Sequence, residues 1–359
     1  MTAERLRPLR ALLPPAAYWS DEWFDTEQER LFGATWHLAA TACELGRPGD
    51  YATVDAGHDP LVVVRTRSGA VRAFHNRCPH RAVALCEGRG NTGERFVCPY
   101  HAWSFDLDGT LRRVPQRAQF AGLDADAHGL DPAGAAEWAG LVFAHPDPGA
   151  GLAAHLGELP AHIGSFRPEL LVPVDRFTIE ARCNWKLFVE NHVDVYHLWY
   201  LHARTLADYD HGRFEWRQLG RNWASYEPLR AGAPARRPSR TVPPIAHLDA
   251  RDRAGIGAHL LFPNVMIASE AQSFVVYVAR PVRPDLTAVD VRILAEPGAD
   301  AAALADAARA FMAEDVAACE AVQRTVRSSR FRVGALAGDH ERPVVEFQRN
   351  VLDALGVHP

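Results

Sequence analysis

Long apolar runs are missing from this 359-residue sequence, and so is an excess of positive charge. No stretch of about 18 apolar residues occurs, so no transmembrane helix is predicted. The opening segment, MTAERLRPLRALLPPAAYW, has no unbroken apolar core, so we expect no signal peptide. The net charge of −5 offers no basic footprint for nucleic acid. Six cysteines in so long a chain do not suggest a disulfide framework. We therefore expect a cytoplasmic protein that binds neither membranes nor nucleic acid.

The first part of the chain is rich in strands and turns. Short apolar runs alternate with turn-forming Asp, Gly and Ser residues from about residue 36 to residue 145. The clearest signals are a strand at Leu61–Arg65, its hairpin partner at Val71–Phe74, a turn at Asp106–Gly109 and a strand at Gly140–Ala144. This pattern predicts a small all-β domain over residues 36–150.

The sequence changes character after residue 150. Helical content is expected at Cys183–Leu206, a loop at Arg230–Pro244, strands at His259–Ile267, Ser273–Arg280 and Val289–Leu294, and one long helix at Ala301–Arg327. Residues 151–359 are therefore predicted to form an α+β domain with an antiparallel sheet and a long C-terminal helix. Residues 1–35 are predicted to be an N-terminal segment that packs on this domain.

Two short boxes in the β-rich region carry potential metal ligands. They read Cys78-Pro-His80-Arg and Cys98-Pro-Tyr-His101-Ala-Trp, so each box offers one thiolate and one imidazole. Two Cys and two His fit a structural zinc site. They also fit a Rieske [2Fe–2S] cluster, in which the Cys pair holds one iron and the His pair the other. A box of a zinc site usually holds two ligands of the same type. Each box here holds one Cys and one His, which favours the cluster.

A second group of potential ligands lies in the segment Asn-Trp-Lys-Leu-Phe-Val-Glu-Asn-His-Val-Asp194-Val-Tyr-His197-Leu-Trp-Tyr-Leu-His202. Asp194 and His197 are about 60° apart around a regular helix and would share a face. His197 and His202 are about 140° apart, so they converge only if the helix ends, bends or bulges between them. Two His and one carboxylate on one face of an iron leave positions open for O2 and substrate.

The third ligand of such an iron must come from elsewhere in the chain. The apolar stripe of the predicted long helix runs through Leu304, Ala308, Phe311, Cys319, Val322 and Val326. Asp315 falls on this stripe, whereas Glu314 is rotated about 100° away. A carboxylate on a buried stripe is costly unless it is paired or bound to metal. We therefore favour Asp315 over Glu314 as the ligand.

These motifs, taken together and in this order, resemble the large (alpha) subunits of the Rieske non-haem iron oxygenases, the ring-hydroxylating family. The resemblance implies a Rieske domain inserted near the N-terminus of a catalytic domain with a helix-grip, START-like fold. It implies that Cys78, His80, Cys98 and His101 ligate the cluster and that His197, His202 and Asp315 ligate a mononuclear Fe(II). Asp194 matches the family's bridging aspartate, which links a cluster histidine to an iron histidine across a subunit interface.

The resemblance also implies an activity. We expect an oxygenase component that uses O2 to hydroxylate, dihydroxylate or demethylate a small organic substrate, as in the catabolism of aromatic hydrocarbons. The chain has no glycine-rich dinucleotide fingerprint, so electrons from NAD(P)H are expected through a separate reductase or ferredoxin. A homotrimer is expected, and an additional small beta subunit is compatible with the resemblance. A Rieske-type electron-transfer protein and a zinc-stabilised binding module are the alternatives, but neither explains the His197–His202 segment.

The sequence leaves several residues open. Tyr196, Trp199, Tyr200, Phe262 and Tyr277 either line an apolar pocket or belong to the core. The four cysteines outside the boxes are expected to be buried thiols, and no role is assigned to them: Cys43, Cys86, Cys183 and Cys319. The substrate is not specified by any motif.

Overall fold

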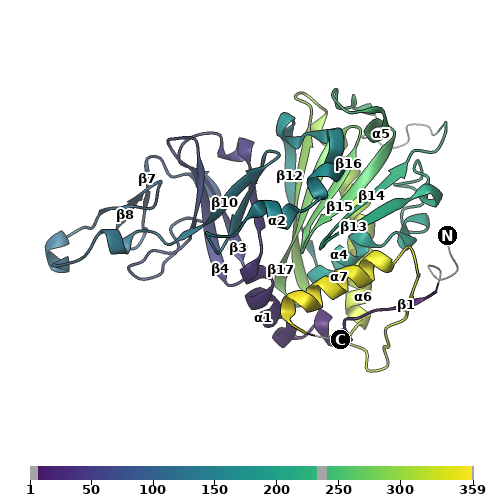
Figure 1. Cartoon of the computed structure of the whole chain (residues 1–359), viewed down its shortest axis with the longest axis horizontal. Helices are drawn as coiled ribbons and strands as arrows, with labels where there is room; N and C mark the ends of the chain where they lie inside the picture. The colour runs from purple at the N-terminus through teal and green to yellow at the C-terminus, as the bar shows by residue number, and fades with distance from the viewer. Residues whose placement is uncertain (1–6, 233–240, 358–359) are drawn as a thin grey trace. The chain divides into compact units, whose positions relative to one another are not determined.

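The computed structural model describes residues 7–232 and 241–357, which form two compact units. One unit comprises Glu27–His155, and the other comprises Met1–Thr26 together with Leu156–Pro359 (Figure 1). The first is almost entirely β and the second mixes an antiparallel sheet with helices, so the predicted α+β class is confirmed. Among the described residues, no helix combines the length and the apolar character needed to cross a bilayer.

The smaller unit is built on two antiparallel sheets. The seven-stranded sheet has the order β2-β11-β10-β5-β4-β3-β6, and a three-stranded sheet has the order β7-β8-β9. The strands are β2 His37–Thr41, β3 Asp50–Ala56, β4 Asp59–Arg65, β5 Val71–His75, β6 Arg89–Asn91, β7 Arg95–Val97, β8 Ser104–Asp106, β9 Leu111–Arg113, β10 Pro132–Trp138 and β11 Leu141–His145. The two helices at its chain boundaries are α1 Asp21–Arg30 and α2 Leu152–Leu156.

The hairpins predicted for the smaller unit are confirmed. The run predicted at Leu61–Arg65 lies in β4 and pairs antiparallel with β5, and the Asp106–Gly109 turn joins β8 to β9. The predicted strand at Gly140–Ala144 corresponds to β11, all of which is buried. These segments are short and local, so alternating side chains and turn residues are enough to specify them.

The larger unit contains one seven-stranded antiparallel sheet, ordered β12-β18-β17-β16-β15-β14-β13, and a two-stranded pairing of β1 with β19. Its strands are β1 Leu9–Arg10, β12 Val172–Ala181, β13 Glu215–Leu219, β14 Asn222–Pro228, β15 Gly255–Leu261, β16 Val265–Glu270, β17 Ser273–Arg283, β18 Leu286–Ala295 and β19 Ala335–Leu336. Its helices are α3 Leu159–Ile163, α4 Trp185–Val193, α5 Ala250–Arg253, α6 Ala301–Thr325 and α7 Arg342–Leu355.

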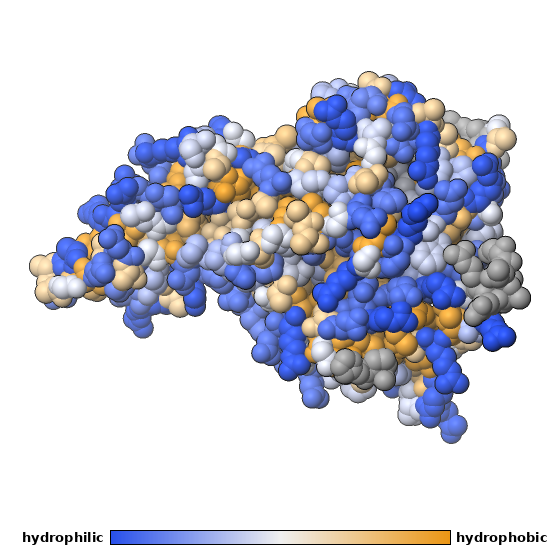
Figure 2. All heavy atoms as spheres, viewed as in Figure 1, coloured by the Kyte–Doolittle hydropathy of each residue, from blue (hydrophilic) through white to orange (hydrophobic). Residues whose placement is uncertain are grey.

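Three of these helices pack together against the sheet. Helix α4 contacts α6, α7 and strands β15 and β17, and α6 contacts β12 (Figure 1). Helix α7 buries Val344, Phe347 and Val351, while its charged residues point outward. Hydrophilic residues accordingly gather along the visible side of α7 in Figure 2. This packing holds α6, which carries Asp315, against α4, whose end leads into the segment with His197 and His202.

Several details differ from the sequence expectations. The strand predicted at His259–Ile267 is two strands, because Phe262-Pro263-Asn264 forms the turn between β15 and β16 and proline cannot donate to the ladder. Val322 was placed on the buried stripe of α6 but is 45% exposed. Cys43 is exposed, although the other five cysteines are buried and all six are free thiols. Part of the loop expected at Arg230–Pro244 lies outside the described residues.

Helix α4 begins at a buried polar cap. Asn184 is only 1% exposed, and its side-chain oxygen accepts the Lys186 backbone N–H at 3.0 Å. Its amide group donates to the Pro284 carbonyl at 2.7 Å. One side chain therefore caps the helix and ties it to the turn between β17 and β18.

We predict that Asn184→Ala lowers stability more than Asp300→Ala does. Asp300 is an exposed N-cap of α6 whose side chain accepts the Ala303 N–H, so its loss should cost about 1 kcal/mol. Loss of Asn184 removes a similar cap and also the part-buried hydrogen bond to the Pro284 carbonyl, which should add about 1 kcal/mol. Scanning calorimetry of both variants measures the difference. An equal drop in melting temperature would show that the bond to Pro284 adds nothing.

Candidate functional site

The two cysteine boxes fold into matching loops. In each loop an alanine four residues after the cysteine donates its backbone N–H to the cysteine carbonyl, at 2.8 Å for Ala82 and 3.0 Å for Ala102. Both alanines have a left-handed backbone, with φ of 58° and 56°. The left-handed residue turns the chain back sharply, so each loop can present the side chains of its cysteine and histidine together. Cys78 and Cys98 are buried in one apolar cluster with Trp103.

The two box histidines lie beside each other. The ring centroids of His80 and His101 are 4.7 Å apart. His80 stacks on Trp103 at 4.8 Å with an interplanar angle of 2°, and His101 stacks on Tyr100 at 3.8 Å. The Nδ1 atoms of both histidines are buried, and neither has a hydrogen-bond partner among the described residues. Two adjacent, unpaired ring nitrogens fit a pair of iron ligands.

The two box cysteines also lie beside each other. Burial raises the pKa of the Cys78 thiol to about 11, the adjacent Cys98 adds to the rise, and the backbone N–H groups of His80 and Arg81 oppose it. Without a metal this thiol stays protonated, and a bound iron would replace its proton. The loops therefore bring together two cysteine sulfurs and two histidine nitrogens, which is the donor set of a Rieske cluster. In most zinc sites of this kind, each box supplies two ligands of the same type.

In the larger unit, the candidate metal ligands follow directly on the end of α4. The α-helix stops at Val193, and Asp194 is its C-cap with extended backbone. A short 3₁₀ helix, η8 Tyr196–Trp199, then carries His197. The expectation that Asp194 and His197 share a helical face is therefore wrong. The two still meet, because one Asp194 oxygen accepts the Tyr196 N–H at 2.6 Å and the other lies 3.2 Å from His197 Nδ1.

Helix α6 completes the group. The Nε2 atoms of His202 and His197 lie 2.9 and 3.7 Å from the Asp315 Oδ1 atom. One potential ligand atom from each of these three residues lies within 4.8 Å of those of the other two. The ring centroids of His197 and His202 are 5.1 Å apart, so the break in the helix does bring the histidines together. Asp315 is 5% exposed, as the stripe argument predicts.

Further polar groups hold these three side chains in place. Glu314 accepts from His202 Nδ1 at 2.8 Å and from the Thr205 hydroxyl at 2.5 Å. The Asn191 amide donates to Asp315 Oδ1 at 2.8 Å. Glu314 was set aside as the less suitable ligand, but it lies on the opposite edge of the same imidazole. Metal-bound histidines commonly donate their second N–H to such a partner.

The environment of His202 fixes its protonation. Burial lowers its pKa, but the hydrogen bonds and charges of Asp315 and Glu314 outweigh this effect and the net pKa is raised. The two carboxylates therefore favour the protonated form of the ring when no metal is bound. A divalent metal at Nε2 would displace the proton from that nitrogen while Nδ1–H continues to donate to Glu314.

A cavity of about 70 Å³ opens beside the three candidate ligands. Its aromatic walls are Phe188, Phe214, Trp223, Tyr277 and Phe311, and aliphatic side chains fill most of the remainder. Its polar lining includes Glu227, whose carboxylate lies 2.6 Å from the His211 ring. Of the five aromatics left open by the sequence, Tyr277 lines this cavity. Tyr196 and Tyr200 are exposed, Phe262 is in the core, and Trp199 meets the His211 ring edge to face at 5.4 Å.

Sequence reasoning missed the residues that support the ligands. Glu314 could have been found from the sequence. It is next to Asp315, and a histidine held by Asp315 through one ring nitrogen has a second nitrogen on the opposite edge that a neighbouring carboxylate can reach. Asn191 lies in the same segment as the histidines but was not singled out. Thr205 and the Glu227–His211 pair come from segments without any metal-binding pattern, so only their placement in the fold identifies them.

A sulfur–imidazole group in one unit and a His₂–carboxylate group in the other define a protein with two distinct metal centres. Comparisons with known families agree. Residues 35–126 match the family described as the Rieske [2Fe–2S] domain. Residues 168–356, more than half of the chain, match the ring hydroxylating alpha subunit (catalytic domain). The chain belongs to this ring-hydroxylating alpha subunit family, whose cofactors are a Rieske [2Fe–2S] cluster and a mononuclear iron that uses O2.

Individual relatives fall in both monooxygenase and dioxygenase groups. The chain is 34% identical over 220 residues to the carnitine monooxygenase oxygenase subunit of Escherichia coli, covering 60% of this chain and 59% of that protein. It is 33% identical over 231 residues to the anthranilate 1,2-dioxygenase large subunit of Burkholderia cepacia, covering 56% and 53%. The matches thus span less than two thirds of these relatives. A quaternary ammonium Rieske monooxygenase has the same fold, with a TM-score of 0.83, 24% identity and coverage of 98% and 96%.

We predict different consequences for the two neighbouring acids of α6. Asp315→Ala should abolish binding of the mononuclear metal, because it removes one of the three candidate ligands. Glu314→Ala should weaken metal affinity about 10- to 100-fold, the usual effect of losing an outer partner of a metal-bound histidine. Titration of the metal-free site with Co(II) measures both effects. Asp306→Ala, an exposed carboxylate of the same helix, is the matched control. Wild-type affinity in the Asp315 variant would assign the third ligand elsewhere.

Proposed function

We propose that this protein is the oxygenase component of a Rieske-type system that hydroxylates or oxidatively demethylates a small organic substrate at non-haem Fe(II). The observation that carries the proposal is the convergence of His197, His202 and Asp315 beside an apolar cavity. Three protein ligands on one side of an iron leave coordination positions free. When bound, the iron would activate O2 with electrons delivered through the cluster.

We assign the ligands of the two centres accordingly. Cys78, Cys98, His80 and His101 hold the cluster in the domain of residues 36–150, and His197, His202 and Asp315 hold the mononuclear iron in the domain of residues 151–359. The unpaired, buried Nδ1 atoms of His80 and His101 support the first assignment. The separation of the three donor atoms, at most 4.8 Å, supports the second.

The surrounding residues have supporting tasks at the iron. Asp194 and Glu314 accept hydrogen bonds from the Nδ1 atoms of His197 and His202, so both Nε2 atoms would be free to hold the iron. Asn191 orients the Asp315 carboxylate through a 2.8 Å hydrogen bond. The aromatic walls of the cavity exclude water from the reacting centre, which limits the unproductive consumption of activated oxygen.

The lining of the cavity narrows the class of substrate. Its lining includes aromatic rings and the carboxylate of Glu227 but no Lys or Arg side chain within the described parts of the chain. Three carboxylates of the lining, Asp194, Asp315 and Glu227, more than offset the charge of a bound Fe(II). An anionic substrate would therefore meet no net positive charge, whereas a neutral or cationic molecule meets apolar rings and carboxylates. Both aromatic hydrocarbons and alkylammonium compounds satisfy this condition.

The direct test is a turnover screen by mass spectrometry. We predict a gain of one or two oxygen atoms, or loss of a methyl group, for a neutral arene or a methylated ammonium compound rather than for an anionic acid. Naphthalene, a choline-type ammonium ion and benzoate are suitable representatives. The purified enzyme should contain about three irons per chain and show a rhombic EPR signal when reduced. A zinc-loaded, colourless protein from iron-sufficient cells would instead support the zinc-stabilised binding module.

The electrons come from outside the chain in this proposal. A separate reductase or ferredoxin delivers them to the cluster, and the protein works in the cytoplasm as a homotrimer, with or without a small beta subunit. Asp194 is the proposed link between centres of neighbouring copies, since its carboxylate can hold His197 of its own chain and His101 of the next. A carboxylate has spare acceptor capacity for both rings.

Asp194→Asn provides the test of this link. The variant keeps an acceptor oxygen but loses the charge, so both metals should stay bound while electron transfer between centres slows severely. Single-turnover reoxidation of the reduced cluster, followed optically, measures the rate. Cluster and iron contents serve as internal controls. Reoxidation at the wild-type rate, or full activity from a monomer at assay concentration, would contradict the proposed role of Asp194.

A further inference from the structure

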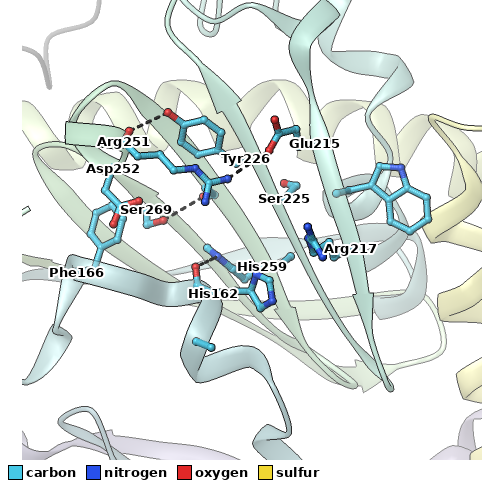
Figure 3. Close-up of a pocket in the computed structure, with 14 residues that line it drawn as sticks. His162, Phe166, Glu215, Arg217, Ser225, Tyr226, Arg251, Asp252, His259 and Ser269 are labelled. Atoms are coloured by element: carbon cyan, nitrogen blue, oxygen red, sulfur yellow. Dashed lines mark hydrogen bonds and ion pairs between the residues drawn. The ribbon is translucent and has the colours of Figure 1, made fainter. Parts of the chain in front are cut away.

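One wall of the cavity beside the candidate iron ligands carries a carboxylate that lies outside the ligand group. Side chains alternate along β14, and Trp223, Ser225 and Glu227 all line this cavity. The intervening Tyr226 lines a separate cleft on the other face of the sheet (Figure 3). The neighbouring strand β15 adds Ile256, which is the cross-strand partner of Glu227. Glu227 therefore lies in a largely apolar wall of the cavity.

His211 holds this carboxylate from one side. The 3₁₀ helix η9, His211–Arg213, packs beside β14. It brings His211 Nδ1 to 2.6 Å from Glu227 Oε2. A neutral imidazole can donate this hydrogen bond, so the carboxylate keeps its charge. The two side chains are only 3% and 7% exposed, and the pair is therefore shielded from bulk water.

The second oxygen of Glu227 has no such partner. The Oε1 atom accepts no hydrogen bond within residues 7–232 and 241–357. It also keeps some exposed surface, unlike the Trp223 Nε1 atom in the same wall, which is fully enclosed. Since Glu227 lines the cavity, a ligand inside can reach this oxygen. A buried pair with a purely structural role would need no charged oxygen open to the cavity, because such an oxygen is costly to desolvate.

Aromatic rings share this wall with the carboxylate. The ring centroids of Phe214 and Trp223 are 6.5 Å apart, with an interplanar angle of 33°. Trp223 lies four residues before Glu227 on the same face of β14, and Phe214 directly follows the 3₁₀ helix that carries His211. The faces of aromatic rings attract cations, and tryptophan does so most strongly. The wall thus combines two features that favour a positive charge.

The other charges of the lining leave Glu227 for a substrate. Asp194 and Asp315 also line the cavity, and no Lys or Arg side chain lines it in the described part of the chain. A bound Fe(II) would compensate two of the three carboxylates. Asp194 is hydrogen-bonded to His197 and Asp315 to His202, so both belong to the candidate iron site. Glu227 is the carboxylate whose charge remains.

We propose that Glu227 binds the positively charged nitrogen of a small alkylammonium substrate, with Trp223 and Phe214 packed against its alkyl groups. The inference rests on the proposed oxygenase function and selects one of the two substrate classes compatible with it. A neutral arene would contact the rings but leave the second oxygen of Glu227 without a partner. An ammonium ion satisfies both. A substrate that also carries a carboxylate would bring a charge that this lining does not compensate.

Ligands matched in shape but not in charge test the proposal. Choline and 3,3-dimethyl-1-butanol have the same shape, and only choline carries a positive nitrogen. Calorimetric titration of the anaerobic holoenzyme should show that choline binds about tenfold or more tightly than the uncharged alcohol. Trimethylglycine, the carboxylate counterpart of choline, should bind more weakly than choline. Equal or tighter binding of either comparison compound overturns the proposal.

Glu227→Gln separates the charge from the fold. Glutamine keeps an oxygen for the His211 N–H, so a purely structural role survives the substitution. The variant should lose most of its preference for choline, while its affinity for the uncharged alcohol stays within about twofold. Glu215→Gln, a 73% exposed carboxylate in the cleft on the other face, should behave like the wild type (Figure 3). An unchanged preference in the Glu227 variant, or equal loss of affinity for both ligands, overturns the proposal.

The place of binding has a separate readout that needs no turnover. Nitric oxide bound to the mononuclear Fe(II) gives an EPR signal that reports its surroundings. Choline should change this signal in the wild type and in Glu215→Gln, and only at about tenfold higher concentration in Glu227→Gln. Saturable binding without a change in the signal would place choline outside the cavity and overturn the proposal. A protein that binds choline but oxidises nothing would contradict the oxygenase function alone, whereas an oxygenase that binds only arenes would contradict the ammonium proposal alone.

Discussion

His202 is held between two consecutive carboxylates of α6, and the rest of the candidate iron site is arranged around that contact. Asp315 approaches one ring nitrogen at 2.9 Å and Glu314 approaches the other at 2.8 Å, so the imidazole can neither rotate nor tilt freely. The ring also stacks on Phe311 at 4.6 Å. Because α4 packs on α6, the segment after α4 delivers His197 to the same carboxylate. A buried carboxylate and a buried imidazole compensate each other here, which neither would tolerate alone.

The two units hold their candidate ligands in different ways. The box loops of the smaller unit leave two imidazole nitrogens without a hydrogen-bond partner in the described part of the chain, and the rings of Trp103 and Tyr100 fix the imidazoles by stacking. The larger unit instead saturates its imidazoles with carboxylates. A cluster must accept an electron without moving its ligands, and stacked rings provide that rigidity. A mononuclear iron benefits from ligands whose charge is already balanced on the side away from the metal.

Much of this arrangement could be predicted from the sequence because its ligands lie in local motifs. The cysteine boxes are tight turns, and the position of Asp315 follows from helical periodicity alone. The shared helical face of Asp194 and His197 was wrong, because the helix ends one residue before Asp194 and the contact runs through a 3₁₀ turn. Glu314 was underestimated, because an angle of about 100° around a helix separates two carboxylates that can still hold opposite edges of one ring. Val322 shows a limit of helical periodicity. The periodicity identifies the apolar face of α6, but it does not show how far along the helix that face is covered by other elements.

The pleat of β15 places the cavity beside the candidate iron ligands on one side of a single strand, and an outer cleft lined by Gly257 and His259 on the other. Substitutions along this strand alter one wall at a time, since neighbouring side chains face different compartments. An insertion or deletion in the strand has a larger effect. One residue inserted or deleted ahead of Gly257 would exchange the two faces, turning His259 toward the iron and sending Ala258 to the outer cleft. The strand thus tolerates substitutions far better than insertions or deletions. Variants of this protein that act on different substrates are expected to keep the length of β15 unchanged.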